Sequence, residues 1–303
     1  MQHRAGFVGI LGQTNVGKST LLNAMMGEKL LITSPKPQTT RNRIRCVYTV
    51  PYAQIVFVDT PGLHRPTNKL SRHILREAFR ALRGVDLIYY VVEPWRKVSA
   101  YDARVLEQME IDEVPVFLLV NKVDTAQGNA VAETLLAYDA LDRFEELFPV
   151  SARQALIDPK RLGDLLATTI ARLPAAGAIF PEDVRIDESN EFLIEELIRE
   201  KVFLHIREEV PYSVAVRVKS IDPRENDDLL DIRAELLVER ESQKGILIGK
   251  RGAMIKRIGS EARQDIETLF GCPIFLDLKV NVLRGWTRDS EAIDDLAGGG
   301  GRS

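Results

Sequence analysis

The clearest signal in this 303-residue chain is the stretch Gly12-Gln13-Thr14-Asn15-Val16-Gly17-Lys18-Ser19-Thr20. Its first part fits the pattern G-x-x-x-x-G-K-S, with an apolar strand-like segment at 7–11 before it and a helix-length stretch from Lys18 onward. In this pattern the glycines let backbone N–H groups surround an anion, the lysine adds charge at the β- and γ-phosphates, and the serine hydroxyl can bind Mg²⁺. Since a helix N-terminus also faces the phosphates, Gly12–Thr20 is predicted to be a nucleotide-binding loop.

Short apolar runs alternate with helix-length amphipathic stretches over the first 173 residues. The runs lie at 7–11, 55–58, 85–92, 116–120 and 147–150. Buried strands that alternate with helices are typical of a mostly parallel sheet with helices on both faces, so we predict an α/β fold. The neighbouring segments 43–50 and 54–59 are close enough in sequence to predict a hairpin, and therefore one antiparallel strand.

A second motif indicates which base is bound. Asn121-Lys122-Val123-Asp124 follows the apolar run at 116–120. The Asp124 carboxylate can accept hydrogen bonds from the N1–H and the 2-amino group of guanine, whereas adenine offers neither donor. The backbone of Ser151-Ala152-Arg153 can present an N–H to the guanine O6. The sequence therefore predicts GTP and GDP as ligands; an ATPase is the weakest alternative, and replacing Asp124 by asparagine would distinguish the two.

Two further stretches can report whether a γ-phosphate is present. Asp59-Thr60-Pro61-Gly62-Leu63 follows an apolar run, so the Asp59 carboxylate can hold Mg²⁺ through water and the Gly62 N–H can reach the γ-phosphate. Thr39-Thr40-Arg41 lies in the loop between the first predicted helix and the second predicted strand. A threonine hydroxyl there can reach Mg²⁺ only while the γ-phosphate is bound. Ser19, Asp59 and one of these threonines are therefore candidate magnesium ligands.

The composition changes at residues 174–190, which are rich in proline, small residues and acidic residues. We predict a linker there, between a domain over 1–173 and a second domain over 191–290, followed by a disordered glycine-bearing tail over 291–303. The second domain has the pattern of a helix, two strands, a glycine-rich turn, a helix and a third strand, which indicates a small α+β fold.

The glycine-rich turn Gly249-Lys250-Arg251-Gly252 has the G-X-X-G form that clamps a nucleic-acid backbone. Residues 240–257 hold six basic side chains and a single acidic one, although 41 Lys and Arg against 44 Asp and Glu give the whole chain a net charge of −3. RNA binding is therefore predicted to be local. The candidate RNA-binding residues are Lys244, Ile248, Gly249, Lys250, Arg251, Gly252, Ile255 and Lys256. For isoleucines 246, 248, 255 and 258, core packing is an equal alternative.

The five motifs of the first domain resemble, in order, those of the translation-factor class of P-loop GTPases. The stretches Pro37–Arg43 and Asp59–His64 look like those of the Era family, in which a GTPase domain precedes a type II KH domain. The resemblance covers about residues 5–290. It implies that Thr40 is the threonine that senses Mg²⁺, and that Lys18, Thr40 and Gly62 act in hydrolysis of GTP to GDP and phosphate. It also implies binding to the 3′ end of 16S rRNA and to the 30S ribosomal subunit during its maturation.

One position departs from the Ras-like pattern. Leu63 stands where a water-orienting glutamine is found in Ras-like proteins, so intrinsic hydrolysis is expected to be slow. The next residue, His64, is expected to be a solvated loop side chain, and the alternative is that it orients the attacking water. GTPases resembling this one often have an asparagine at the position of Asn15 and are stimulated by potassium, so K⁺ is a candidate cofactor. The alternative is that Asn15 only braces the loop.

The remaining features concern compartment and partners. Two cysteines, Cys46 and Cys272, indicate no disulfide framework, and no apolar run reaches the roughly 18–20 residues of a membrane span, so a cytoplasmic monomer is expected. Peripheral attachment to the inner face of the membrane is attributed to the family. One alternative is a membrane-associated signalling GTPase whose C-terminal domain binds a protein. Another is a GTPase of transfer-RNA modification, which the KH-like region disfavours.

Overall fold

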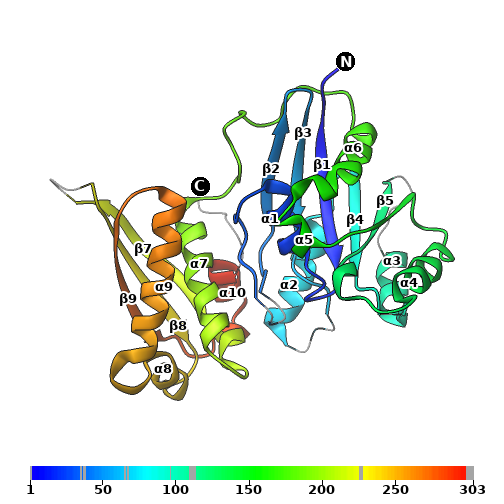
Figure 1. Ribbon diagram of the computed structural model, residues 1–303. Coiled ribbons are helices and arrows are strands. Elements are labelled where there is room, and N and C mark those ends of the chain that lie inside the picture. The colour runs from blue at the N-terminus through cyan, green and yellow to red at the C-terminus, as the bar shows by residue number, and fades with distance from the viewer. Residues whose placement is uncertain are drawn as a thin grey trace. The chain divides into compact units, whose positions relative to one another are not determined.

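The computed structural model (Figure 1) describes residues 2–34, 36, 39–64, 66, 68–95, 97–108, 114–224 and 228–297. The chain forms two compact units. The first consists of Met1–Leu31, Asn42–Arg65 and Ile74–Asp187, and the second of Ile32–Arg41, Pro66–His73 and Glu188–Ser303. The chain thus passes into the second unit twice before its C-terminal part begins. Pro37 and Gln38 of the stretch Pro37–Arg43, and residues 298–303 of the predicted tail, lie outside the described residues.

The first unit is built on a six-stranded sheet with the order β2-β3-β1-β4-β5-β6. β2 pairs antiparallel with β3, and all the other pairs are parallel, which confirms the predicted hairpin and the predicted α/β class. The strands are β1 (Arg4–Gly12), β2 (Ile44–Val50), β3 (Ala53–Asp59), β4 (Leu87–Val92), β5 (Val116–Val120) and β6 (Glu146–Pro149).

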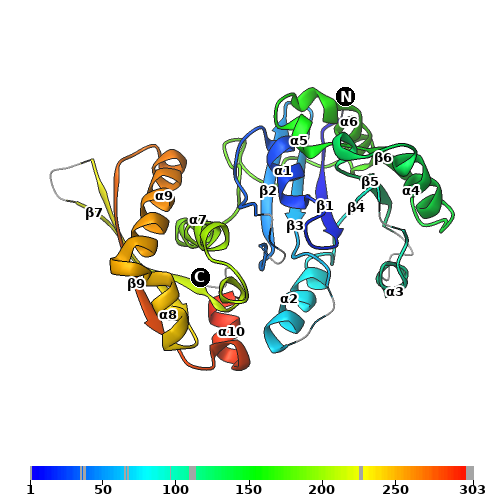
Figure 2. The same cartoon turned by 60° about the horizontal axis from the view of Figure 1, so that its bottom comes forward.

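Strand β4 shows why both faces of this sheet are covered. Tyr89 and Tyr90 are both fully buried, although neighbouring side chains of a strand point to opposite faces. The Tyr89 hydroxyl lies 2.5 Å from Thr169 Oγ1 of α6, whereas the Tyr90 ring packs against Tyr138 of α4. Figure 2 shows α6 and α3 on opposite sides of the sheet. The helices are α1 (Lys18–Met26), α2 (Lys69–Arg80), α3 (Ala100–Gln108), α4 (Ala130–Asp139), α5 (Ala152–Ala155) and α6 (Gly163–Arg172), with 3₁₀ turns η1 (Val123–Thr125) and η2 (Pro159–Leu162).

The C-terminal part of the second unit has the predicted order of elements around a three-stranded sheet, β7-β8-β9. β7 and β8 are antiparallel, and β8 and β9 are parallel. Helices α7 and α9 lie side by side on this sheet (Figure 1), and the Ser189 hydroxyl caps α7 by accepting from the Phe192 N–H at 3.2 Å. The elements are α7 (Asn190–His205), η3 (Val210–Ser213), β7 (Ala215–Pro223), β8 (Leu230–Val238), α8 (Glu241–Ile248), η4 (Lys250–Gly252), α9 (Ala253–Phe270), β9 (Ile274–Val282), η5 (Trp286–Arg288) and α10 (Ser290–Ala297).

The end of the chain differs from the sequence expectation. A disordered tail is predicted over 291–303, whereas the structure has helix α10 over Ser290–Ala297. Ile293 on this helix is buried, and the Asp295 carboxylate forms an ion pair with Arg217 of β7. The glycines that suggested disorder begin only at 298, so they say little about the amphipathic turns before them.

Membrane spans and clustered metal ligands are both absent from the described residues. No helix among them is long and apolar enough to cross a membrane. Within the same part of the chain, no group of three or more His, Cys, Asp and Glu side chains is arranged to hold a metal ion.

Candidate nucleotide and RNA sites

The predicted phosphate loop connects β1 to α1 and has little space for side chains. Gly12 has a φ of 154°, and a Cβ there would lie 2.3 Å from the Val91 carbonyl oxygen. Gly17 has a φ of 96°, and a Cβ there would lie 2.4 Å from the Asn121 amide nitrogen. Both positions therefore require glycine. Asn15 between them also has a positive φ, 65°, which asparagine tolerates better than most residues.

Lys18 folds back over this loop. Its Nζ donates hydrogen bonds to the carbonyl oxygens of Gly12 and Gln13, each at 3.1 Å, and only 6% of the residue is exposed. Burial lowers the pKa of Lys18 to about 8, and the charge of Asp59 opposes this shift. Anionic phosphate oxygens beside the ammonium group would favour its charged form, so a bound nucleotide would raise this pKa again.

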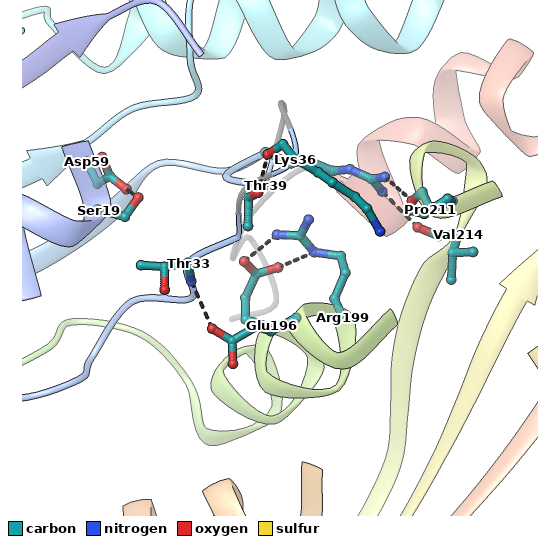
Figure 3. A network of polar contacts seen from close by, with 11 residues as sticks. Ser19, Thr33, Lys36, Thr39, Asp59, Glu196, Arg199, Pro211 and Val214 are labelled. Carbon is teal, nitrogen blue, oxygen red and sulfur yellow. Dashed lines mark hydrogen bonds and ion pairs between the residues drawn. The ribbon is translucent and has the colours of Figure 1, made fainter. Parts of the chain in front are cut away.

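Two of the predicted magnesium ligands meet in the first unit. The Ser19 hydroxyl donates to Asp59 Oδ2 at 2.9 Å, as Figure 3 shows, and Asp59 at the end of β3 is fully buried. Mg²⁺ is usually bound through one or two carboxylates together with water and substrate phosphates, so this pair of oxygens fits it. Thr40, which is 8% exposed, belongs to the second unit.

The residues after Asp59 are paired with the phosphate loop. The Thr60 hydroxyl donates to the Ile10 carbonyl at 2.6 Å, and the Leu63 N–H donates to the Gly12 carbonyl at 2.9 Å. Gly62 approaches so closely that a Cβ on it would lie 2.8 Å from Thr14 Cα. Leu63 is 1% exposed, so its side chain packs in the core and faces no water. Pro61 is buried in the same turn.

His64 differs from the expectation of a solvated side chain. It is only partly exposed, and its Nδ1 lies 3.0 Å from the Gly62 carbonyl oxygen. The Tyr101 hydroxyl of α3 donates to the His64 carbonyl at 3.0 Å. This histidine is therefore held within the segment that follows β3.

The two predicted guanine-binding segments come together, and Asn121 connects them to the phosphate loop. Asn121 donates from Nδ2 to the Val16 carbonyl at 2.8 Å, and its Oδ1 accepts from the Ala152 N–H at 2.9 Å. The Ser151 hydroxyl donates to Asp124 Oδ1 at 2.5 Å, which orients that carboxylate. Lys122 and Val123 complete the turn, and Arg153 is exposed at the start of α5. These contacts place Asp124 beside the N-terminus of α5.

Lys122 connects this turn to the phosphate loop. Its Nζ donates to the Asn15 carbonyl at 2.6 Å, pairs with the buried Glu93, and lies 6.0 Å from the centroid of the Trp95 ring. No sequence motif assigned Glu93 or Trp95 to this site. Both follow β4 directly, and the end of a parallel strand at the ligand-binding edge is the signal that could have indicated them.

A buried carboxylate on α3 was also missed. Asp102 accepts from Gln13 Nε2 at 2.8 and 3.0 Å and from the Tyr90 hydroxyl at 2.8 Å. It also forms a capping box with Ser99: the Ser99 N–H donates to its carboxylate at 3.2 Å, and its own N–H donates to Ser99 Oγ at 3.0 Å. The S-x-x-D spacing is visible in the sequence, but its tertiary partner Gln13 is not. Asp102 therefore braces the phosphate loop from α3.

In the second unit, the predicted RNA loop lies between α8 and α9. Gly249 and Gly252 have φ values of 69° and 79°, and Arg251 also has a positive φ of 53°. A Cβ on Gly249 would lie 2.7 Å from Met254 Cβ, so glycine is required there. The side chains of Lys250 and Arg251 are exposed at the tip of the turn. This geometry places two positively charged side chains next to a backbone that a nucleic-acid phosphate can approach closely.

The isoleucines and lysines around this loop differ in how far they are buried. Ile258 is fully buried in the core, whereas Ile246 is 49% exposed. Ile248 and Ile255 pack against the core but keep part of their surface accessible. Lys256 is exposed and Lys244 is partly exposed, so the loop has basic side chains on both flanks.

Comparisons with known proteins agree with this arrangement. Residues 7–122 match the family model of 50S ribosome-binding GTPases, and residues 209–287 match a KH domain model. The chain is 44% identical over 293 residues to GTPase Era of Geobacter metallireducens, which covers 97% of each protein. It is 43% identical to GTPase Era of Thermoanaerobacter sp., covering 98% of this chain and 97% of the relative.

Two solved structures are similar over 96% of this chain and 97% of their own, each at 35% identity. One is Era in complex with MgGDPNP and nucleotides 1506–1542 of 16S ribosomal RNA, with a TM-score of 0.89. The other is an Aquifex aeolicus Era variant bound to GDP·AlF4⁻, with a TM-score of 0.90.

Proposed function

Because this chain belongs to the Era family of GTPases, we propose that it is a GTP-hydrolysing switch that binds 16S rRNA. The rRNA segment is the 3′ region, and the activity serves assembly of the small ribosomal subunit. The observation that carries this proposal is the presence in one chain of a phosphate loop next to Asp124 and of the exposed Lys250-Arg251 pair between two glycines. The first arrangement suits a guanine nucleotide and the second a phosphate backbone.

The residues of the first unit suit phosphoryl transfer to water. Ser19 and Asp59, with Thr40, would hold Mg²⁺, which when bound neutralises charge on the β- and γ-phosphates. Lys18 adds a positive charge, and the Gly62 N–H is the candidate donor to the γ-phosphate. The Leu63 side chain is buried and cannot orient water, which supports a slow intrinsic rate.

Since Leu63 cannot orient water, another group is needed to stabilise the charge of the transition state, and a monovalent cation is the candidate. The Asn15 carbonyl accepts a hydrogen bond from Lys122. Because Asn15 lies in the phosphate loop, a K⁺ ion that it holds would add positive charge beside the phosphates. We expect GTP hydrolysis to be at least about tenfold faster in KCl than in NaCl at equal ionic strength. Equal rates in the two salts, measured as phosphate release, would leave Asn15 as a loop brace only.

The RNA partner is tested by crosslinking the purified protein, with a non-hydrolysable GTP analogue bound, to total cellular RNA. We expect sequencing of the crosslinked fragments to show enrichment of the 3′ end of 16S rRNA. Enrichment of transfer RNA would contradict the ribosomal assignment. Absence of RNA together with capture of a protein would favour the signalling alternative.

The same proposal gives a place of action. Small subunits are assembled in the cytoplasm, so we propose that the protein acts there. We also propose that it acts as a monomer. Any contact with the inner face of the membrane would then be peripheral.

A further inference from the structure

The carboxylate of Asp102 lies in the first turn of α3, and only 1% of the residue is exposed. Both carboxylate oxygens accept from Gln13 Nε2, at 2.8 and 3.0 Å. The Tyr90 hydroxyl donates to Oδ1 at 2.8 Å, and the Ser99 hydroxyl donates to Oδ2 at 2.6 Å. A buried carboxylate is stable only with such donors, so the positions of these four side chains depend on one another.

Capping of α3 does not account for the bond to Gln13. Ser99 and Asp102 form the capping box by themselves, and an acidic side chain also suits the positive end of a helix. The Gln13 side chain comes from the phosphate loop, 89 residues earlier in the chain. Asp102 therefore holds the residue that directly follows Gly12 of that loop.

The backbone at Gln13 joins the phosphate loop to the segment after β3. Gln13 and Leu63 form a parallel bridge. In this bridge the Leu63 N–H donates to the Gly12 carbonyl at 2.9 Å, and the Leu63 carbonyl accepts from the Thr14 N–H at 3.3 Å. The Gln13 carbonyl also accepts from Lys18 Nζ at 3.1 Å. A displacement of Gln13 would therefore move Lys18 and the Leu63 backbone together.

The residue before Asp102 contacts the same segment. The Tyr101 hydroxyl donates to the His64 carbonyl at 3.0 Å, and His64 Nδ1 lies 3.0 Å from the Gly62 carbonyl oxygen. Gly62, the candidate donor to the γ-phosphate, is thus held through Leu63 on one side of it in sequence and through His64. Both attachments lead to the first turn of α3.

We propose that Asp102 is a positioning residue for GTP hydrolysis and that it acts through Gln13. By holding Gln13, it keeps Lys18 and the Gly62 N–H where the γ-phosphate needs them in the transition state, when small displacements of such groups are costly. The base and the other phosphates are expected to be held by Asp124 and by the N-terminus of α1, so nucleotide affinity should change much less than the hydrolysis rate. The inference rests on the proposed function, because it assigns Lys18 and Gly62 to the hydrolysis of GTP.

The test compares single-turnover GTP hydrolysis with nucleotide affinity in the full chain. Phosphate release is measured without RNA and with the protein in excess over GTP, and the dissociation constant for GDP is measured by calorimetry. Asp102→Asn keeps the size of the side chain but removes its charge and one acceptor. We expect its rate constant for hydrolysis to fall at least about tenfold. Its dissociation constant for GDP should change by less than about threefold, since the lost interaction acts mainly in the transition state.

Gln13→Met tests whether the effect passes through Gln13. Methionine has a similar length but no N–H donor, so this variant should lower the rate constant as much as Asp102→Asn does. The double variant should lose no more than either single variant, because the two residues act in series. If the two losses multiply instead, Asp102 acts independently of Gln13 and the inference is overturned. Gln13 lies outside α3, so Gln13→Met remains informative if Asp102→Asn folds poorly.

A pair with reversed polarity provides a rescue. Gln13→Glu places a second carboxylate against Asp102, so it should slow hydrolysis more than Gln13→Met does. Adding Asp102→Asn to that variant again sets an amide donor against a carboxylate, and should return most of the lost rate. A role in helix capping alone predicts no such recovery, so its absence would contradict the proposal.

Ser99→Ala is the matched control, because it removes a side chain that caps α3 and keeps both partners of the bond between Asp102 and Gln13. It should lower the melting temperature, as Asp102→Asn should, and leave the rate constant unchanged. If Ser99→Ala slows hydrolysis as much as Asp102→Asn does, the effect comes from the stability of α3 and the positioning role is overturned.

The outcomes also separate this inference from the proposed function. If Asp102→Asn and Gln13→Met hydrolyse GTP at the unaltered rate, the positioning role is overturned and the proposed function stands. If the unaltered protein releases no phosphate from GTP, the proposed function fails, and the positioning role fails with it.

Discussion

Replacing Asp124 by asparagine should lower the affinity for GTP at least about 100-fold and transfer the preference to xanthosine triphosphate. The carboxylate is predicted to accept two hydrogen bonds from guanine, and a hydrogen bond to a charged group contributes about 1.5–3 kcal/mol. Xanthine has an oxygen in place of the 2-amino group, so the asparagine N–H₂ gains an acceptor that guanine does not offer. Titration of both nucleotides by calorimetry measures the change.

The structure provides a sharp control for this experiment. Ser151 donates to Asp124, and it can donate equally to the asparagine oxygen, so the turn itself should persist. Asp142→Asn makes the same change at an exposed position with a positive φ of 52°, which asparagine accepts, and should leave GTP affinity unchanged. An Asp124→Asn variant that binds GTP as tightly as the unaltered protein would show that the base is recognised elsewhere.

The fold class was predictable because its signals are local in the sequence. Each apolar run of the first 173 residues is long enough for a buried strand, and the glycine positions of the phosphate loop have one steric explanation. The short separation of β2 and β3 allowed only a hairpin. The order of elements around β7, β8 and β9 followed for the same reason.

The contacts that hold the candidate sites in place were less accessible. Arg41 binds backbone carbonyls of residues 211, 212 and 214, and carbonyls are present in every residue, so no sequence pattern distinguishes these partners. Asp102 is recognisable as a helix cap, but its bond to Gln13 joins residues far apart in the chain. Helix α10 was hidden because its contacts, through the buried Ile293 and the ion pair of Asp295 with Arg217, are tertiary ones that no local pattern indicates.

The grouping of residues 32–41 with the C-terminal unit has a similar origin. The sequence places this segment within the predicted domain 1–173, where chain continuity favours it. The bonds from Thr33, Lys36 and Arg41 to the region of α7 connect positions about 170 residues apart. In the sequence, Lys36 and Arg41 look like ordinary solvated basic residues, and only the structure shows what surrounds them.

Replacing both Lys250 and Arg251 by glutamate should lower RNA affinity by at least about 100-fold and leave GTP hydrolysis without RNA unchanged. Both side chains are exposed at the tip of the loop, where each can make a charge-assisted bond to phosphate that contributes about 1.5–3 kcal/mol. Loss of two phosphate contacts should also reduce the slope of log affinity against log salt by about 1.4 for a single-stranded RNA. Fluorescence anisotropy of a labelled 16S 3′-end oligoribonucleotide at several KCl concentrations measures both quantities.

The chain contains a closely matched control for this double replacement. Lys160 and Arg161 form the same exposed dipeptide, also within a 3₁₀ turn, but in the first unit. Their replacement by two glutamates changes the net charge equally, so it should alter RNA affinity only through the general charge of the molecule and keep the salt slope. If both double variants weaken RNA binding to the same extent, the protein holds RNA through its overall charge, and the loop between α8 and α9 is not the binding site.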